Sequence, residues 1–205
     1  MGQAEFARLL TRNLLGIVDL APEQISALYS HFQLLLKWNQ RINLTSVRSP
    51  VEMVTRHYCE SLFFAAKVPD AEDRRTFLDL GSGAGFPGLP MAILESDWRV
   101  TLLEAHKRKS VFLREAARDL PNVEVLAKRA EDVEHHYDWL VSRAVRIEDV
   151  LSQIPRLSGN IGFLISEVDM PLIRGCHDVQ WEEPIRLPWS ERRVCVFGSF
   201  CPSSS

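Results

Sequence analysis

A glycine-rich turn between a short apolar run and a helical pattern constrains this chain more than any other feature. The segment reads Phe77-Leu78-Asp79-Leu80-Gly81-Ser82-Gly83-Ala84-Gly85-Phe86-Pro87-Gly88. Glycine permits a sharp turn and lets a ligand approach the main chain closely, because it has no Cβ atom. A helix that begins just beyond the turn offers unpaired N–H groups. A strand, a glycine turn and a helix in this order predict a ligand-binding turn in an α/β protein.

An acid follows this turn where a ribose-binding carboxylate is expected. Glu104 ends the next predicted strand, 23 residues after Gly81, and an acid at this distance accepts hydrogen bonds from a ribose diol in dinucleotide-binding folds. Residues 83–88 also satisfy the pattern GxGxxG. A nicotinamide dinucleotide is therefore one candidate ligand, and S-adenosylmethionine is another.

Asp79 separates these two ligands. Its carboxylate would repel a pyrophosphate by about 1 kcal/mol at contact distance, even in water, whereas it favours the ammonium and sulfonium of S-adenosylmethionine. Pro87 and Pro90 also remove two N–H donors from the start of the helix. The turn therefore favours S-adenosylmethionine over a dinucleotide. A plain tight turn without a ligand is the third interpretation.

The pattern changes along the chain at Thr76. Before it, apolar residues recur at three- and four-residue spacing, which predicts buried helix faces. One predicted helix contains Phe6, Leu10 and Leu14, a second begins at Pro22, and a third begins with the capping sequence Ser49-Pro50-Val51-Glu52 and runs to about Ala66. The polar stretch 69–75 reads as a connector, and residues 203–205 as a frayed end.

From Thr76 onward, short β-branched runs alternate with helical patterns, which predicts parallel βαβ units. A helix between the second and third strands should bury Val111, Phe112, Ala116 and Leu120 on one side. We expect a helical extension over residues 1–70 and a Rossmann-like domain over 71–205. The predicted strands are Thr76–Leu80, Arg99–Leu103, Val123–Leu126, Trp139–Ser142, Gly162–Ile165 and one near Val194–Phe200.

The composition restricts the partners and the compartment. The formal net charge of −3 argues against a general nucleic-acid coat, so any RNA contact must come from a local basic patch. The four cysteines form no CxxC pair and no ligand spacing with histidine, which favours free thiols and no metal site. Charged residues interrupt the first apolar pattern, and no apolar run reaches the roughly 20 residues of a membrane span. We expect a cytoplasmic protein without membrane contact, and a monomer.

Several further segments resemble the RsmG (GidB) family over about residues 20–165. Residues 38–45, Trp-Asn-Gln-Arg-Ile-Asn-Leu-Thr, match its WNxxxNLT segment, and residues 56–61 match its RHxxDS segment with Glu60 in place of aspartate. The turn GSGAGFPGLP, Glu104 with the later pairs 108–109 and 112–113, Arg129-Ala130-Glu131 and Ser142-Arg143-Ala144 follow in order. Family members are class I S-adenosylmethionine-dependent methyltransferases: a mostly parallel seven-stranded α/β sheet flanked by helices, with an N-terminal helical extension.

The resemblance implies methyl transfer from S-adenosylmethionine to N7 of a guanine in 16S ribosomal RNA of the small ribosomal subunit. It implies that Gly81 and Phe86 line the cofactor, that Gly83 forms the tight turn and that Glu104 holds the ribose. It places Ala130 and Glu131 beside the adenine, and Arg143 beside the methionine portion. It also makes Arg56 and His57 candidate RNA contacts. The basic cluster Lys107, Arg108 and Lys109 is a further candidate.

Two observations bear on the chemistry. No Asp/Asn-Pro-Pro-aromatic segment and no cysteine follow the fourth predicted strand, which favours a ring-nitrogen acceptor over an exocyclic amine and excludes covalent pyrimidine chemistry. We therefore nominate no general base. Ser166-Glu167 stand where the family usually has Lys-Gly, which puts a substrate contact from that loop in doubt. The alternatives are a catalytically weakened RNA-binding or ribosome-assembly factor, and a dinucleotide-dependent oxidoreductase.

Overall fold

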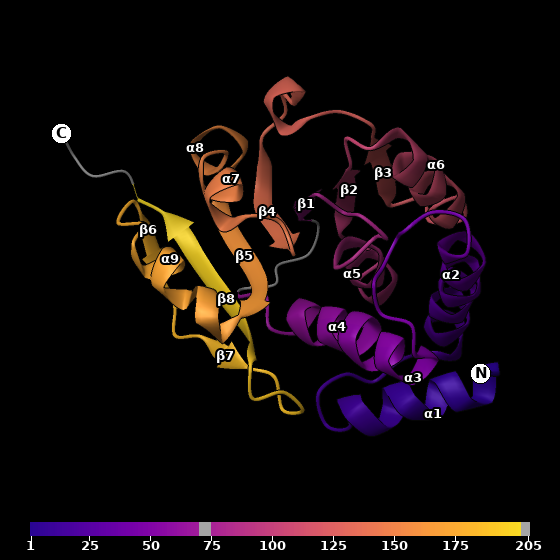
Figure 1. Ribbon diagram of the computed structural model, residues 1–205. Helices are drawn as coiled ribbons and strands as arrows, with labels where there is room; N and C mark the ends of the chain where they lie inside the picture. Colours follow the sequence, from indigo (N-terminus) through magenta and orange to yellow (C-terminus); the bar gives the residue numbers. More distant parts are fainter. Residues whose placement is uncertain (70–74, 202–205) are drawn as a thin grey trace.

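An eight-stranded sheet forms the centre of the computed structural model, which describes residues 1–69 and 75–201 (Figure 1). The strands lie in the order β3-β2-β1-β4-β5-β8-β6, and the short β7 pairs with β8. Strands β1 to β5 are parallel to one another, whereas β8 is antiparallel to its neighbours β5, β6 and β7. The strands are β1 Thr76–Leu80, β2 Arg99–Leu103, β3 Val123–Leu126, β4 Tyr137–Arg143, β5 Ser158–Ser166, β6 Val179–Trp181, β7 Ile185–Arg186 and β8 Arg193–Phe200.

Helices cover both faces of this sheet. Figure 1 shows α1, α2 and α4 gathered beside α5 and α6, while α7, α8 and α9 lie toward the other side. The segments α3, η1 and α4 follow one another without a break, and η1 is π-helical. The helices are α1 Gln3–Leu14, α2 Pro22–Asn39, α3 Pro50–Met53, η1 Val54–Cys59, α4 Glu60–Ala65, α5 Gly88–Leu94, α6 Lys107–Ala116, η2 Ala130–Asp132, α7 Ile147–Leu151, α8 Ile154–Leu157, η3 Glu167–Asp169 and α9 Met170–Arg174.

Two hydrophobic cores lie on opposite sides of the sheet, because alternate residues of a strand point to opposite faces. Phe77 and Val141 belong to the core that also holds Phe32 and Tyr58 of the N-terminal helices. Leu78 and Leu140 belong to the core under α7, α8 and α9. The N-terminal helices therefore share one core with the sheet.

The α/β fold with a mostly parallel sheet confirms the predicted fold class. The first three predicted strands coincide with β1, β2 and β3, and the other three are longer than predicted. The two-residue β7 joins the seven strands of the main order. The predicted connector 69–75 and frayed end 203–205 fall mostly or wholly outside the described residues, as does the proposed boundary at 70.

One prediction for the α6 region was wrong. Val111 is 50% exposed, whereas Phe112 and Leu113 are buried. The buried stripe of α6 runs through Phe112 and Leu113, and Val111 lies about 100° from Phe112 on the side away from Leu113, where the helix faces solvent. Separately, no helix within residues 1–69 and 75–201 is long and apolar enough to cross a bilayer.

Candidate functional site

The glycine turn leaves the carboxyl end of β1 and enters α5. Gly81, Gly83 and Gly85 have positive φ angles of 76°, 57° and 88°, a conformation that residues with a Cβ rarely adopt. A Cβ on Gly81 would lie 2.4 Å from Cγ2 of Val145, and one on Gly85 would lie 2.3 Å from Cδ1 of Leu89. The turn therefore requires glycine. It lies between β2 and β4, the strands on either side of β1, where open α/β sheets bind ligands.

Glu104 closes one side of the turn. Its side chain follows β2 and is 8% exposed. One carboxylate oxygen accepts a hydrogen bond from the Gly83 N–H at 3.0 Å, and the other accepts one from the His106 N–H at 2.8 Å. A carboxylate has about four acceptor positions, so both oxygens retain capacity for a diol. Glu104 therefore lies against the glycine turn, and its predicted role in holding the ribose stays a prediction.

Asp79 lies beneath the turn and is fully buried. Its Oδ2 accepts a hydrogen bond from the Gly88 N–H at 3.0 Å, while Oδ1 has no partner among the described residues. Burial raises the pKa of Asp79 to about 7. A buried carboxylate with an unpartnered oxygen favours a cationic ligand nearby over a phosphate, which fits S-adenosylmethionine.

Two histidines of the N-terminal helices contact the turn. His31 Nε2 lies 3.0 Å from the Ala84 carbonyl oxygen, and His31 Nδ1 lies 2.9 Å from the Tyr58 hydroxyl. The carbonyl can only accept, so Nε2 carries the proton and Nδ1 accepts from Tyr58. Burial lowers the pKa of His31 to about 4, which keeps it neutral. His57 stacks on the Phe86 ring, with centroids 4.8 Å apart.

Phe86 packs into the N-terminal helices. Its ring is 6% exposed and contacts His31 and Tyr58 edge-on as well as His57 face-on. This packing anchors the turn to the extension. Lining of the cofactor by Phe86 stays a prediction.

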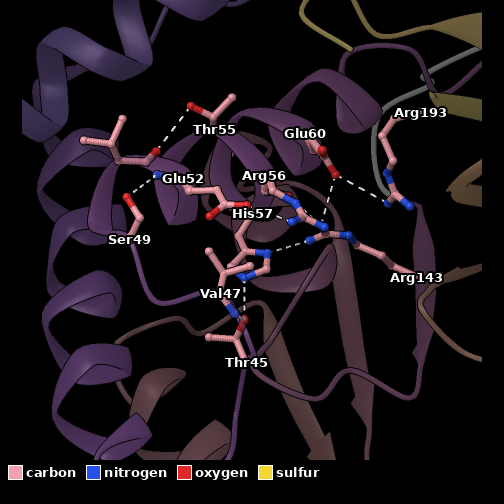
Figure 2. Close-up of polar contacts among 11 residues, drawn as sticks. Thr45, Val47, Ser49, Glu52, Thr55, Arg56, His57, Glu60, Arg143 and Arg193 are labelled. Atoms are coloured by element: carbon pink, nitrogen blue, oxygen red, sulfur yellow. Dashed lines mark hydrogen bonds and ion pairs between the residues drawn. The ribbon is translucent and has the colours of Figure 1, made fainter. Parts of the chain in front are cut away.

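Arg143, at the end of β4, reaches across to the N-terminal helices (Figure 2). It donates to the Arg56 carbonyl oxygen at 2.5 Å and to Glu60 Oε2 at 3.0 Å. Its Nη1 lies 3.0 Å from His57 Nδ1. With a side chain only 9% exposed, Arg143 is held by three partners from one helical segment.

The contact with Arg143 fixes the tautomer of His57. A guanidinium only donates, so His57 Nδ1 accepts and Nε2 carries the proton. Nε2 then donates to Thr45 Oγ1 at 2.7 Å, which also accepts from the Val47 N–H at 3.1 Å. Burial, with help from the charges of Arg143 and Arg56, lowers the pKa of His57 to about 3. His57 is a neutral link whose lone pair is occupied.

Glu60 joins two arginines. Its Oε2 lies 3.0 Å from Arg143 Nη2 and 3.4 Å from Arg193 Nη2, and its side chain is 3% exposed. Arg193 begins β8 and also donates to the Leu164 carbonyl oxygen at 3.1 Å. Sequence reasoning missed Arg193, Thr45 and His31 as site residues. The only sequence signal for a buried carboxylate was the acid Glu60 in the segment 56–61.

The π-helical segment η1 makes this cluster possible. It contains Arg56 and His57, and Glu60 begins the α-helix directly after it. A π-turn is wider than an α-turn and often occurs at functional sites. Here it presents one carbonyl, one ring nitrogen and one carboxylate to Arg143. The Arg56 side chain itself points to the surface, where it pairs with Glu52 at 2.8 Å.

The other predicted residues lie around the same sheet edge. Ala130 is half-buried and Glu131 is exposed in η2, after β3, and the Ala130 carbonyl oxygen accepts from Arg156 at 2.5 Å. The basic residues 107–109 form the first turn of α6, which begins three positions after Glu104. Arg108 lines a cavity of about 270 Å³ with Lys37, Trp38, Arg41 and Ile42.

Trp38 is half-buried, donates to Glu115 at 3.2 Å and packs edge-on against Phe112. Lys37 and Arg41 were not predicted as site residues. Their four-residue spacing, on either side of Trp38, was the available signal that they lie on one helix face.

Comparison with known proteins adds three findings. The family model described as rRNA small subunit methyltransferase G matches residues 24–165. A protein of that name from Nitrosomonas europaea is 41% identical over 140 residues, covering 66% of this chain and 64% of that protein. One from Pseudomonas syringae pv. syringae is 42% identical over 131 residues, covering 62% and 59%. The chain thus spans about three fifths of the length of these relatives.

Solved structures with the same fold include a ribosomal protein L11 methylase from Lactobacillus delbrueckii subsp. bulgaricus, with a TM-score of 0.58, 17% identity and coverage of 71% of this chain and 79% of that chain. A putative RNA methyltransferase from Pyrococcus horikoshii has a TM-score of 0.56 and 15% identity, covering 77% and 89%. At these identities the likeness shows the class I methyltransferase fold.

Proposed function

Because this chain belongs to the family of rRNA small subunit methyltransferase G, we propose that it transfers a methyl group from S-adenosylmethionine to N7 of a guanine in 16S ribosomal RNA. The observation that carries the proposal is the hydrogen bond between Glu104 and the Gly83 N–H at the β1 switch point. It brings the carboxylate that we assign to the ribose onto the glycine turn, which also covers buried Asp79 with its unpartnered oxygen.

We assign the following cofactor contacts. Gly81 and Gly83 offer main chain to the cofactor, and Glu104 accepts from the ribose hydroxyls with its free acceptor positions. Ala130 and Glu131 lie beside the adenine, and Arg143 lies beside the methionine portion. Phe86 lines the site as part of the glycine turn, which its ring anchors to the N-terminal helices.

The chemistry asks for alignment and for no proton transfer. When bound, S-adenosylmethionine supplies an electrophilic methyl group on a sulfonium. Guanine N7 has a lone pair and no proton; as its bond to the methyl carbon forms, the carbon–sulfur bond breaks and its electron pair stays with sulfur. Positioning of the reactants can supply several kcal/mol of the barrier. His57, which stacks on Phe86 of the turn, has its lone pair on Arg143, in keeping with a reaction that needs no base.

The basic residues and His57 are the remaining predicted site residues. We propose that Arg56, Lys107, Arg108 and Lys109 contact RNA phosphates, because the overall charge is negative and binding must use a local patch. His57 was predicted as an RNA contact. Since it is buried and both its nitrogens are occupied, we propose that it acts by holding Arg143. We further propose a cytoplasmic monomer, with residues 1–70 as an extension appended to the catalytic domain.

The first experiment incubates the protein with radiolabelled S-adenosylmethionine and either naked 16S RNA or intact 30S particles. Label recovered as 7-methylguanosine supports the proposal. S-adenosylhomocysteine binding without transfer to either substrate indicates the assembly-factor alternative instead. In a melting assay, S-adenosylhomocysteine should raise the melting temperature and NAD(P) should not.

The second experiment tests the cofactor site itself. Glu104→Ala should weaken S-adenosylhomocysteine binding by about 10- to 150-fold, since charge-assisted hydrogen bonds contribute about 1.5–3 kcal/mol. Isothermal calorimetry measures the change. Glu131→Ala, on the adenine side of the proposed site, should weaken binding less than Glu104→Ala. Unchanged affinity in Glu104→Ala would contradict the assignment of the ribose.

A further inference from the structure

A cavity of about 220 Å³ opens at the carboxyl ends of β4 and β5. Ala144 and Val145 line it directly after β4, Ser166 ends β5 in its wall, and Asp169 and Leu172 close it from η3 and α9. Val145 is the wall that this cavity shares with the glycine turn, since its Cγ2 is the atom nearest to a Cβ built on Gly81. The cavity therefore lies immediately beside the proposed methyl-donor site.

Arg193 provides hydrogen-bond donors in the cavity wall. It lines the cavity and is 23% exposed. One nitrogen, Nη2, faces Glu60 and the Leu164 carbonyl oxygen. A guanidinium has five N–H donors, so several remain for a ligand. Its ion pair with Glu60 also connects this wall to Arg143.

Asp169 provides an unpaired acceptor. Its residue is half-buried, precedes α9, and makes no side-chain cap to that helix. Unlike its neighbour Glu167, which pairs with Arg186 at 2.6 Å, the Asp169 carboxylate has no hydrogen bond or ion pair to any residue in 1–69 or 75–201. A half-buried carboxylate without a partner is available to a ligand with N–H donors.

Arg146 and Glu148 also line the cavity, and both are exposed; the rest of the lining is mainly apolar. Ile147 and Leu164 are buried in it, and Leu172 is 46% exposed. Apolar side chains in a cavity wall suit a flat ring. An apolar slot with donors on one wall and an acceptor on another matches a purine that has left its stack.

Guanine has the complementary edges. N7 and O6 are adjacent acceptors on one edge, and N1–H and the exocyclic amino group are donors on the opposite edge. If N7 faces the methyl donor beyond Val145, O6 turns toward the arginine wall, and the two donors turn away from the glycine turn. Adenine would present an amino group where guanine presents O6, so Arg193 would face a donor.

Resting on the proposed methyl transfer, we propose that this cavity receives the acceptor guanine, with Asp169 accepting from its N1–H and amino groups and Arg193 donating to O6. Ser166, at one of the two positions that depart from the family's Lys-Gly, then forms an uncharged part of the wall.

Asp169→Asn tests the assignment, because the amide keeps the shape and offers an N–H to the guanine amino group. It should lower kcat/KM for 16S RNA by about 10- to 100-fold, the loss expected for a hydrogen bond to a charged group, with S-adenosylhomocysteine affinity unchanged. The control Asp149→Asn removes the same charge from the exposed first turn of α7, outside the cavity, and should stay within about twofold of the wild type. Wild-type kinetics in Asp169→Asn would overturn the proposal.

A substrate replacement supplies the second readout. The wild-type enzyme identifies the labelled guanosine, and an RNA with inosine at that position lacks the amino group. Inosine should reduce kcat/KM severalfold for the wild type and hardly at all for Asp169→Ala. Equal losses in both enzymes would overturn the contact with the amino group. A wild-type protein that binds S-adenosylhomocysteine but labels no RNA refutes the proposed function, and the base site with it.

Discussion

Glu60→Gln is expected to lower the free energy of unfolding by about 3–5 kcal/mol, because a single carboxylate neutralises two guanidiniums. The side chains of Glu60 and Arg143 are 3% and 9% exposed, and their charged atoms lie 3.0 Å apart. Arg193 approaches the same oxygen at 3.4 Å but is 23% exposed. Glutamine preserves size and one carbonyl acceptor, so the substitution isolates the charge.

The magnitude follows from these distances. At an effective dielectric constant of about 20, charges 3.0–3.4 Å apart attract by about 5 kcal/mol per pair. Solvent screens the Arg193 pair, so only part of its attraction counts. Burial of the carboxylate carries a desolvation cost that glutamine does not, so only part of the two attractions is lost on substitution. The net loss is therefore well below the sum of both attractions.

Urea denaturation followed by circular dichroism measures the loss. The matched control is Glu52→Gln, which removes an exposed pair with Arg56 and should cost less than about 0.5 kcal/mol. In a double-mutant cycle, Arg193→Gln should recover about 1–2 kcal/mol of the Glu60→Gln cost. Equal losses in the two glutamate variants, or strict additivity in the cycle, would refute the reasoning.

Three further outcomes are expected. The pKa of Asp79 is about 7 in the fold against 3.8 normally, so between these values the folded protein binds more protons than the unfolded chain, and the contribution of Asp79 to stability falls as pH rises. The free energy of unfolding of Asp79→Asn should therefore rise by up to about 4 kcal/mol relative to that of the wild type between pH 4 and pH 8. Urea titrations measure this difference, and a difference that stays constant with pH would contradict the reasoning. The pKa of His31 is about 4 in the fold against 6.5 normally, so the unfolded chain binds more protons and the contribution of His31 to stability is lost as pH falls below 6.5. His31→Phe should therefore show a smaller decrease in melting temperature at acid pH than the wild type, and an unaltered slope would argue against this. Gly85→Ala should cost about 1–3 kcal/mol, because φ is +88° and a Cβ would strike Leu89; Gly2→Ala, with open space around its Cβ, is the control for the same thermal denaturation, and equal stability of the two variants would contradict the strain.

The sequence predicted the elements whose patterns are local. The strands β1, β2 and β3 have their predicted bounds, because each is a short run of apolar and β-branched residues. Ser49 caps α3 by accepting from the Glu52 N–H at 3.4 Å, with Pro50 in the first turn.

The sequence could not predict features that depend on distant contacts or short elements. Helices α7, α8 and α9 have five, four and five residues, too few for a helical period to be recognised. Arg143 meets Glu60, 83 positions away in the chain, and no local pattern encodes that contact. The π-helical geometry at Val54–Cys59 likewise has no simple signature, so a plain α-helix to about Ala66 was expected.

The wider turn at Val54–Cys59 fixes the length of the chain at this point. A π-turn holds about one residue more than an α-turn, so deleting one residue there would tighten the turn to α-helical geometry. Met53 ahead of the segment and Phe63 beyond it are buried in the same core and would keep the flanking helices in place, so the change would fall on the groups between them. The extra residue is therefore part of what presents the Arg56 carbonyl, His57 and Glu60 to Arg143.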